Sequence, residues 1–147
     1  ARITKLSPPG VMKIVRSLAK EDFLISRKGK VVKDVYASKS EKFVQMKRFF
    51  NLYSLYECGI VQFLREEYEE PEGIVLFGSY SKGEDISKSD IDIAITTSKN
   101  LSLDVKKFEN ALKRKINLDE IKIKDAGKEF LNSLSNGIVL YGYLKVQ

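Results

Sequence analysis

The central part of the chain alternates apolar and acidic residues in a pattern that predicts two neighbouring strands. Residues 73–77 (GIVLF) form an apolar run that predicts a buried strand. Residues 90–95 (DIDIAI) alternate, and successive side chains of an extended chain point to opposite faces. Asp90 and Asp92 are therefore expected on one face of the second strand, with its isoleucines in a core. Two adjacent carboxylates repel each other unless a cation compensates their charge.

The N-terminal part of the chain predicts a helix followed by a hairpin. Ser7 is suited to cap a helix, and an apolar stripe with helical spacing runs over residues 11–19. Residues 23–26 and 31–37 are expected strands, joined by the basic turn 27–30 (RKGK). This order resembles the recognition helix and wing of a winged helix-turn-helix domain, whose first helices would lie upstream. The resemblance implies contact with DNA or RNA phosphates. The cations expected to make it are Lys13, Arg16, Lys20, Arg27, Lys28 and Lys30.

Residues 38–70 predict two helices, the first capped by Ser38 or Ser40. The aromatic residues of these helices are expected in a core. We place a domain boundary near residue 52, with the helices as a semi-rigid connector. The chain would then divide into a winged-helix-like module of residues 1–51 and a second domain of residues 52–147. Towards the C-terminus we expect a helix at about 104–115, a strand at 116–124, a short helix at 126–134 and an apolar ending at 137–142.

A glycine–serine turn separates the two central strands. Gly78 allows close approach of the backbone to a ligand, and the Ser79 hydroxyl and the amides that follow can donate to phosphate oxygens. Hard cations such as Mg²⁺ take oxygen ligands and usually keep bound phosphates as partners. A P-loop is excluded, because the glycine spacing from Gly78 to Gly83 is followed by Glu84 where that motif requires lysine.

The pattern Gly-Ser, ten residues, Asp-x-Asp resembles the signature of the minimal nucleotidyltransferases in the polymerase-beta-like superfamily. Residues 76–79 (LFGS), 82–84 (KGE) and 89–92 (SDID) fall where that family places similar residues, and the resemblance runs from about residue 73 to residue 143. One departure is Lys82, where relatives often carry arginine. The positive charge is kept, but the forked donor geometry of the arginine guanidinium is lost. The implied fold class is α+β: a winged-helix-like module and connecting helices, then a mixed nucleotidyltransferase sheet with flanking helices.

The resemblance also implies the site. Asp90 and Asp92 would be catalytic and would bind metal, and Gly78, Ser79, Lys82 and Ser89 would bind the nucleotide. A third acid is expected on the later strand, where Ile121 and Ile123 share one face and thereby place Glu120 on the other. Glu120 is thus the first choice as third catalytic and metal-binding residue. A register based on Ile116 and Leu118, or a bulge, would favour Asp119 instead. Relatives usually carry an aspartate between two aliphatic residues, which this strand does not offer cleanly.

Composition narrows the chemistry further. The chain has no histidine and a single cysteine, Cys58, which excludes Ser-His-Asp catalysis, zinc sites and an internal disulfide. A reducing cytoplasm is the simplest compartment, and no apolar run approaches membrane-spanning length. Any metal must be held by carboxylates, which favours Mg²⁺ or Mn²⁺. Residues 1–50 carry 13 cations and 4 anions (net +9), whereas residues 51–147 carry 13 and 16 (net −3), which supports two modules with different partners.

The resemblance implies metal-dependent transfer of a nucleoside monophosphate from a nucleoside triphosphate, with ATP the first candidate, to an acceptor. That acceptor would be a side chain of a partner protein, such as a toxin, or a nucleic acid. The alternative is a winged-helix nucleic-acid-binding regulator whose second module senses nucleotide or has a degenerate site. A purely structural adaptor is the third interpretation.

Overall fold

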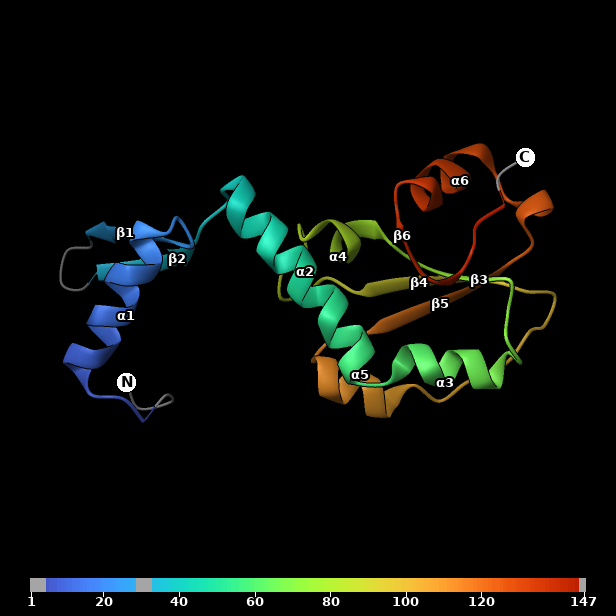
Figure 1. The fold of residues 1–147 in the computed structure, drawn as a ribbon, viewed down its shortest axis with the longest axis horizontal. Coiled ribbons are helices and arrows are strands. Elements are labelled where there is room, and N and C mark those ends of the chain that lie inside the picture. Colours follow the sequence, from blue (N-terminus) through green and yellow to red (C-terminus); the bar gives the residue numbers. More distant parts are fainter. Residues whose placement is uncertain (1–4, 29–32, 146–147) are drawn as a thin grey trace. The chain divides into compact units, whose positions relative to one another are not determined.

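The structure is a computed structural model that describes residues 5–28 and 33–145. The chain forms two compact units, Ala1–Met46 and Lys47–Gln147, and the division falls within one helix. Figure 1 shows the order of the elements along the chain. Within the described residues, no helix has both the length and the apolar character needed to cross a membrane.

The first unit contains a helix and a hairpin. Helix α1 (Pro8–Lys20) begins after Ser7, whose hydroxyl accepts a hydrogen bond from the Gly10 amide, so the expected cap is confirmed. Strands β1 (Leu24–Lys28) and β2 (Lys33–Ala37) pair antiparallel. Arg27 and Lys28 belong to β1 rather than to the turn, because the ladder continues to the pair Lys28–Lys33. Gly29 and Lys30 lie outside the described residues. The apolar stripe of α1 is half-buried at best.

Helix α2 (Glu41–Glu57) begins after Ser40, whose hydroxyl accepts from the Phe43 amide, while the Ser38 hydroxyl accepts from the Ser40 amide. Of the two expected caps, Ser40 is therefore the one at the helix start. Four aromatic residues of α2 are exposed, so the expectation that the aromatic residues here lie in a core is wrong for Phe49, Phe50, Tyr53 and Tyr56. Helix α3 (Ile60–Glu67) follows after a break at Gly59.

The second unit is built on a four-stranded sheet in the order β5-β4-β3-β6. Strands β3 (Gly73–Phe77), β4 (Ile91–Thr96) and β6 (Ile138–Gly142) pair antiparallel, and β5 (Ile116–Ile121) runs parallel to β4. The mixed sheet with flanking helices confirms the predicted α+β class. Helices α4 (Gly78–Lys82), α5 (Lys106–Leu112) and α6 (Lys128–Ser135) and the short turn η1 (Ile123–Asp125) connect the strands.

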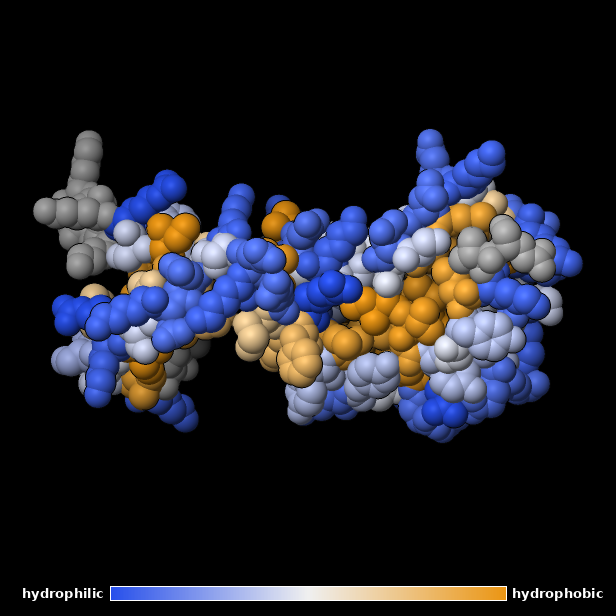
Figure 2. All heavy atoms as spheres, turned by 45° about the horizontal axis from the view of Figure 1, so that its top comes forward, coloured by the Kyte–Doolittle hydropathy of each residue, from blue (hydrophilic) through white to orange (hydrophobic). Residues whose placement is uncertain are grey.

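Each face of the sheet packs against helices. Figure 1 shows α3 and α5 on one side of the sheet and α6 on the other. The isoleucines of β4 are fully buried on the first side, together with Leu64 of α3 and Phe108 of α5. On the second side, Val75, Phe77 and Ala94 pack against Leu134 of α6. Figure 2 shows hydrophilic residues (blue) around an apolar area (orange) on this unit. Because both faces carry cores, apolar residues occur at both parities of the strands.

The C-terminal elements form where they are predicted, with different bounds. Helix α5 ends at Leu112 rather than near residue 115, because Lys113 takes a left-handed conformation (φ 56°) that stops the helix. Strand β5 ends at Ile121 rather than at residue 124, because the chain turns into η1. Helix α6 covers residues 128–135, close to the predicted 126–134.

Candidate active site

The two aspartates lie at the start of β4, where the strand passes between two neighbours. Asp92 pairs in register with Phe77 of β3 and with Asn117 of β5. The alternation predicted from the sequence is confirmed, since Ile91 and Ile93 are fully buried while Asp90 and Asp92 are half-buried. Both carboxylates therefore lie on the face of the sheet that α6 covers in part.

The glycine–serine turn lies directly against Asp92. Gly78 begins α4 immediately after β3 and has a φ of +73°. The backbone conformation favours glycine, and a β-carbon at this position would lie 2.5 Å from Asp92 Oδ2 and would displace that carboxylate. The Ser81 hydroxyl donates to the Gly78 carbonyl over 2.8 Å and holds the turn closed. Ser79 is half-buried and Lys82 is exposed at the end of α4.

The loop between the turn and the aspartates is fixed by a buried acid, Asp85. The residue is 3% exposed, and its carboxylate accepts from Asn51 Nδ2 at 2.8 Å. It also pairs with Lys47 Nζ at 3.0 Å and with the Arg114 guanidinium at 3.2 Å. Ser89 closes the same loop by accepting from the Ile86 amide over 2.9 Å. Ser89 therefore shapes the approach to Asp90 in this structure.

The third acid is the point at which the sequence-based expectation must be corrected. Glu120 lies in register with Ile95, and its carboxylate accepts from the Tyr68 hydroxyl at 2.5 Å and from the Leu101 amide at 2.7 Å. These contacts place Glu120 on the face opposite Asp90 and Asp92. The structure follows the alternative register, because Ile116 and Leu118 pack into the core on the first side, whereas Ile121 packs on the second.

Asp119 lies on the same face as the two aspartates, level with Ala94. Partial burial raises the pKa of the Asp119 carboxyl, and the negative charge of Asp92 raises it further. Asp119 therefore replaces Glu120 as the carboxylate of β5 that faces the aspartate pair.

Asn117 is a site residue that the sequence reasoning missed. Its side-chain amide donates to Asp92 Oδ1 at 2.9 Å and reaches Asp90 Oδ2 at 3.4 Å. The signal was present in the sequence, because Asn117 stands between the aliphatic residues Ile116 and Leu118, in the setting expected for an aspartate. Asn117 was missed because the residue carries an amide where a carboxylate was expected.

The oxygen donors at this site fit a hard divalent cation. Within residues 5–28 and 33–145, no three acidic or thiol side chains converge closely enough to hold a metal ion by themselves. Mg²⁺ usually binds through one or two carboxylates and completes its shell with water and substrate phosphates. Asp90 and Asp92 beside the Gly78 turn provide that number of carboxylates, so the residues present fit Mg²⁺ or Mn²⁺.

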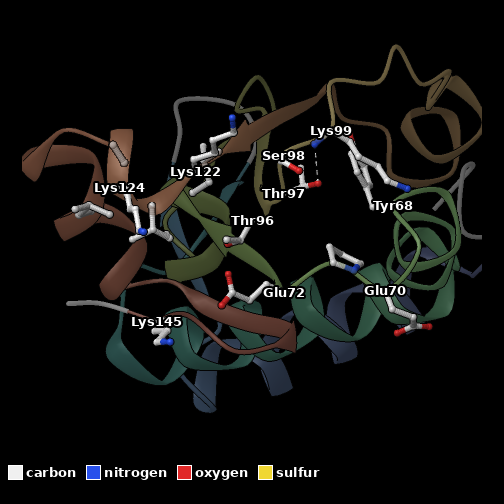
Figure 3. A pocket seen from close by; sticks show the side chains of 15 residues that line it. Tyr68, Glu70, Glu72, Thr96, Thr97, Ser98, Lys99, Lys122, Lys124 and Lys145 are labelled. Atoms are coloured by element: carbon white, nitrogen blue, oxygen red, sulfur yellow. Dashed lines mark hydrogen bonds between the residues drawn. The ribbon is translucent and has the colours of Figure 1, made fainter.

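A cavity of about 810 Å³ lies at the other end of β4. Figure 3 shows Lys122, Lys124 and Lys145 on one side of it, Tyr68 on the other, and Thr96 between them. Thr96 is four residues beyond Asp92, which corresponds to roughly 13 Å along a strand. The cavity is therefore separate from the aspartate pair.

The basic residues of the first unit are placed in part. Lys13, Arg16 and Lys20 are exposed on α1. Arg27 is exposed on β1, where its guanidinium lies 5.8 Å from the centre of the Tyr36 ring. Lys28 ends the strand, and Lys30 lies outside the described residues. Binding of nucleic acid by these residues stays a prediction.

Comparison with known proteins assigns a family to most of the second unit. A family model described as "Polymerase beta, Nucleotidyltransferase" matches residues 59–143. A crystal structure of a toxin-antitoxin with AMP-PNP is 29% identical, with a TM-score of 0.45 over 57% of this chain and 71% of its own. A mutant of the toxin-antitoxin MntA-HpeT is 26% identical, with a TM-score of 0.43 over 57% and 70%. The search of curated proteins gave no match.

Proposed function

Because the chain belongs to the polymerase beta nucleotidyltransferase family, we propose that it transfers a nucleoside monophosphate from a nucleoside triphosphate to an acceptor and releases pyrophosphate. The observation that carries this proposal is the contact between the Gly78 turn and Asp92 on the face shared with Asp90. The acceptor proposed from the sequence is a partner protein or a nucleic acid, and ATP is the first candidate for the triphosphate.

Asp90 and Asp92 would hold the divalent cation on the open face of the sheet. Mg²⁺ or Mn²⁺ bound there would supply the positive charge that orients the triphosphate and stabilises the charge developing during transfer. Asp92 belongs to β4 and Asp90 directly precedes this strand, so the two carboxylates are already neighbours before the substrate binds. Asp119 is the proposed third carboxylate of this face.

The turn after β3 would receive the phosphates. Gly78 keeps the backbone close to Asp92, and the hydroxyl of the neighbouring Ser79 would donate to a phosphate oxygen there. Lys82 would reduce the negative charge of the triphosphate from the end of α4. Ser89 would act indirectly, because its hydroxyl holds the loop that leads into Asp90. Positioning and charge neutralisation of this kind supply most of the catalysis in phosphoryl chemistry.

The experiment that tests the proposal is transfer from labelled triphosphates with and without Mg²⁺, with pyrophosphate release as the readout. Asp92→Asn keeps the shape of the side chain and removes its charge, so we expect transfer to be lost while thermal unfolding is little changed. Asp125→Asn is the matched control, because Asp125 is exposed on η1 and lies outside the site. Metal-dependent transfer by the Asp92 variant at the wild-type rate would refute the proposal.

A further inference from the structure

Asn117 is held in place by the strand that carries it. Its neighbours Ile116 and Leu118 point into the core on the opposite face, and the pairing with Asp92 fixes its level along the sheet. The pairing therefore fixes the backbone of Asn117 beside the aspartate pair, and its exposed side chain turns toward the two carboxylates. It donates to both carboxylates, at 2.9 Å to Asp92 and 3.4 Å to Asp90. Asn117 thus occupies the position from which a third side chain would contact a cation held by the pair.

The remaining acid of this face does not fill that position. Asp119 is two residues farther along β5, which corresponds to roughly 6.6 Å, and is level with Ala94 rather than with Asp92. This agrees with the finding that no three acidic or thiol side chains of the described residues converge on one point. The protein therefore presents two carboxylates and one neutral amide to a bound ion.

We propose that the lack of a third negative charge at position 117, where the neutral Asn117 stands, makes binding of the divalent cation depend on the triphosphate. The inference rests on the proposed function, since it concerns the same site. An ion at Asp90 and Asp92 meets two negative charges from the protein, and the affinity of hard cations rises with the number of charged oxygen ligands. The phosphates of the substrate supply the missing anionic oxygens. Ion and nucleotide therefore bind together, and neither occupies the site firmly alone.

The amide suits this arrangement because it can both donate and accept. Without an ion, its NH₂ group donates to the two carboxylates and reduces their mutual repulsion. With an ion, a rotation about the terminal bond presents its oxygen as a neutral ligand. An aspartate at this position could not donate, so three like charges would face each other until a cation arrived.

The test compares wild type with Asn117→Asp, using Mn²⁺ as the metal and α,β-methylene ATP as a triphosphate that cannot be transferred. Binding of Mn²⁺ is measured by calorimetry and by the loss of the free-ion spin resonance signal. For wild type we expect Mn²⁺ affinity to rise at least about tenfold when the analogue is present. For Asn117→Asp we expect Mn²⁺ alone to bind at least about tenfold more tightly than to wild type.

Two further variants keep the outcome clear. Asn110→Asp makes the same change at an exposed position of α5 and should leave Mn²⁺ binding unchanged. Asn117→Ala adds no charge and should retain the dependence on the analogue. If Asn117→Asp is poorly folded without metal, a rise in its Tm on addition of Mn²⁺ alone replaces the calorimetric readout and supports the inference.

The outcomes separate the inference from the proposed function. If wild type binds Mn²⁺ with the analogue but Asn117→Asp neither binds Mn²⁺ alone more tightly nor gains Tm from it, the inference is overturned and the function stands. Tight Mn²⁺ binding by wild type without the analogue also overturns it. If no variant binds the Mn²⁺–analogue pair, the proposed function fails, and the inference fails with it.

Discussion

Replacement of Asp85 by alanine should destabilise the sheet-bearing unit more than a change at an exposed acid. The Asp85 carboxylate is buried and contacts Lys47, Arg114 and Asn51 within 3.2 Å. Its removal leaves Lys47 and Arg114 without their anionic partner, although each keeps a backbone carbonyl as acceptor, and leaves the Asn51 amide without one of its two acceptors. Breaking a buried ion pair in this way costs about 3–5 kcal/mol.

The lower part of that range applies here. The side chains of Lys47 and Arg114 keep 24% and 19% of their surface exposed, so water can solvate the freed cations in part. We therefore expect a loss of about 3 kcal/mol in the free energy of unfolding. In a unit of about 100 residues, each 1 kcal/mol lowers Tm by about 4–8 °C, so the decrease should be about 12 °C or more.

The assay is urea unfolding followed by circular dichroism, with hydrogen exchange of the β4 amides to assign the transition to the sheet-bearing unit. Asp125→Ala is the control, because Asp125 is exposed and its loss should change the free energy by about 0.5 kcal/mol or less. A loss below about 1 kcal/mol for Asp85→Ala would refute the reasoning, since it would mean that the freed cations are fully solvated or re-paired.

Two further substitutions test the turn and the end of β4. Gly78→Ala should lower the free energy of unfolding by about 1–2 kcal/mol and weaken nucleotide binding, because its β-carbon would meet Asp92 at a φ of +73°. Gly59 also has a positive φ (+82°), but a β-carbon added there would meet no described atom within 4 Å. Gly59→Ala therefore measures backbone strain alone, and urea unfolding of both variants separates strain from contact. An equal loss of unfolding free energy in the two variants would contradict the role of the contact. Thr96→Val should raise the free energy of unfolding by about 1 kcal/mol, because the Thr96 hydroxyl is buried and finds no hydrogen-bond partner among the described residues. A lower Tm for the valine variant would show that the hydroxyl is satisfied.

The alternation at residues 90–95 could be predicted because a single local rule determines it. Isoleucine and aspartate differ so strongly in their preference for burial that the strand has one way to lie, and the structure buries Ile91, Ile93 and Ile95 completely. The position of Gly78 follows from the same region, since the turn joins two strands that pair directly. Local pattern was therefore sufficient for this half of the site.

The sequence pattern could not decide in that way which face of the sheet each side chain of β5 takes. Strand β5 carries apolar residues at both parities, because Ile116 and Leu118 pack on one side of the sheet and Ile121 on the other. Parity counted from Ile121 selects Glu120, whereas parity counted from Ile116 selects Asn117 and Asp119. Only the tertiary structure shows that both faces of this edge are covered in part, so the sequence pattern alone left two registers open.

The long-range contacts that fix the segment from Gly78 to Asp92 could not be predicted from the local sequence pattern either. These contacts are relevant to function. Asn51 of α2 donates both to the Tyr80 carbonyl in α4 and to Asp85 in the following loop, so one side chain ties the segment after Gly78 to the segment that leads to Asp90. Arg114, which follows α5, donates to Asp85 and to the Ser87 carbonyl of that loop. The spacing between the turn and the aspartates is thus maintained by helices outside the motif. Since catalysis by positioning depends on that spacing, loss of Asp85 should impair nucleotide binding even under conditions in which the variant remains folded.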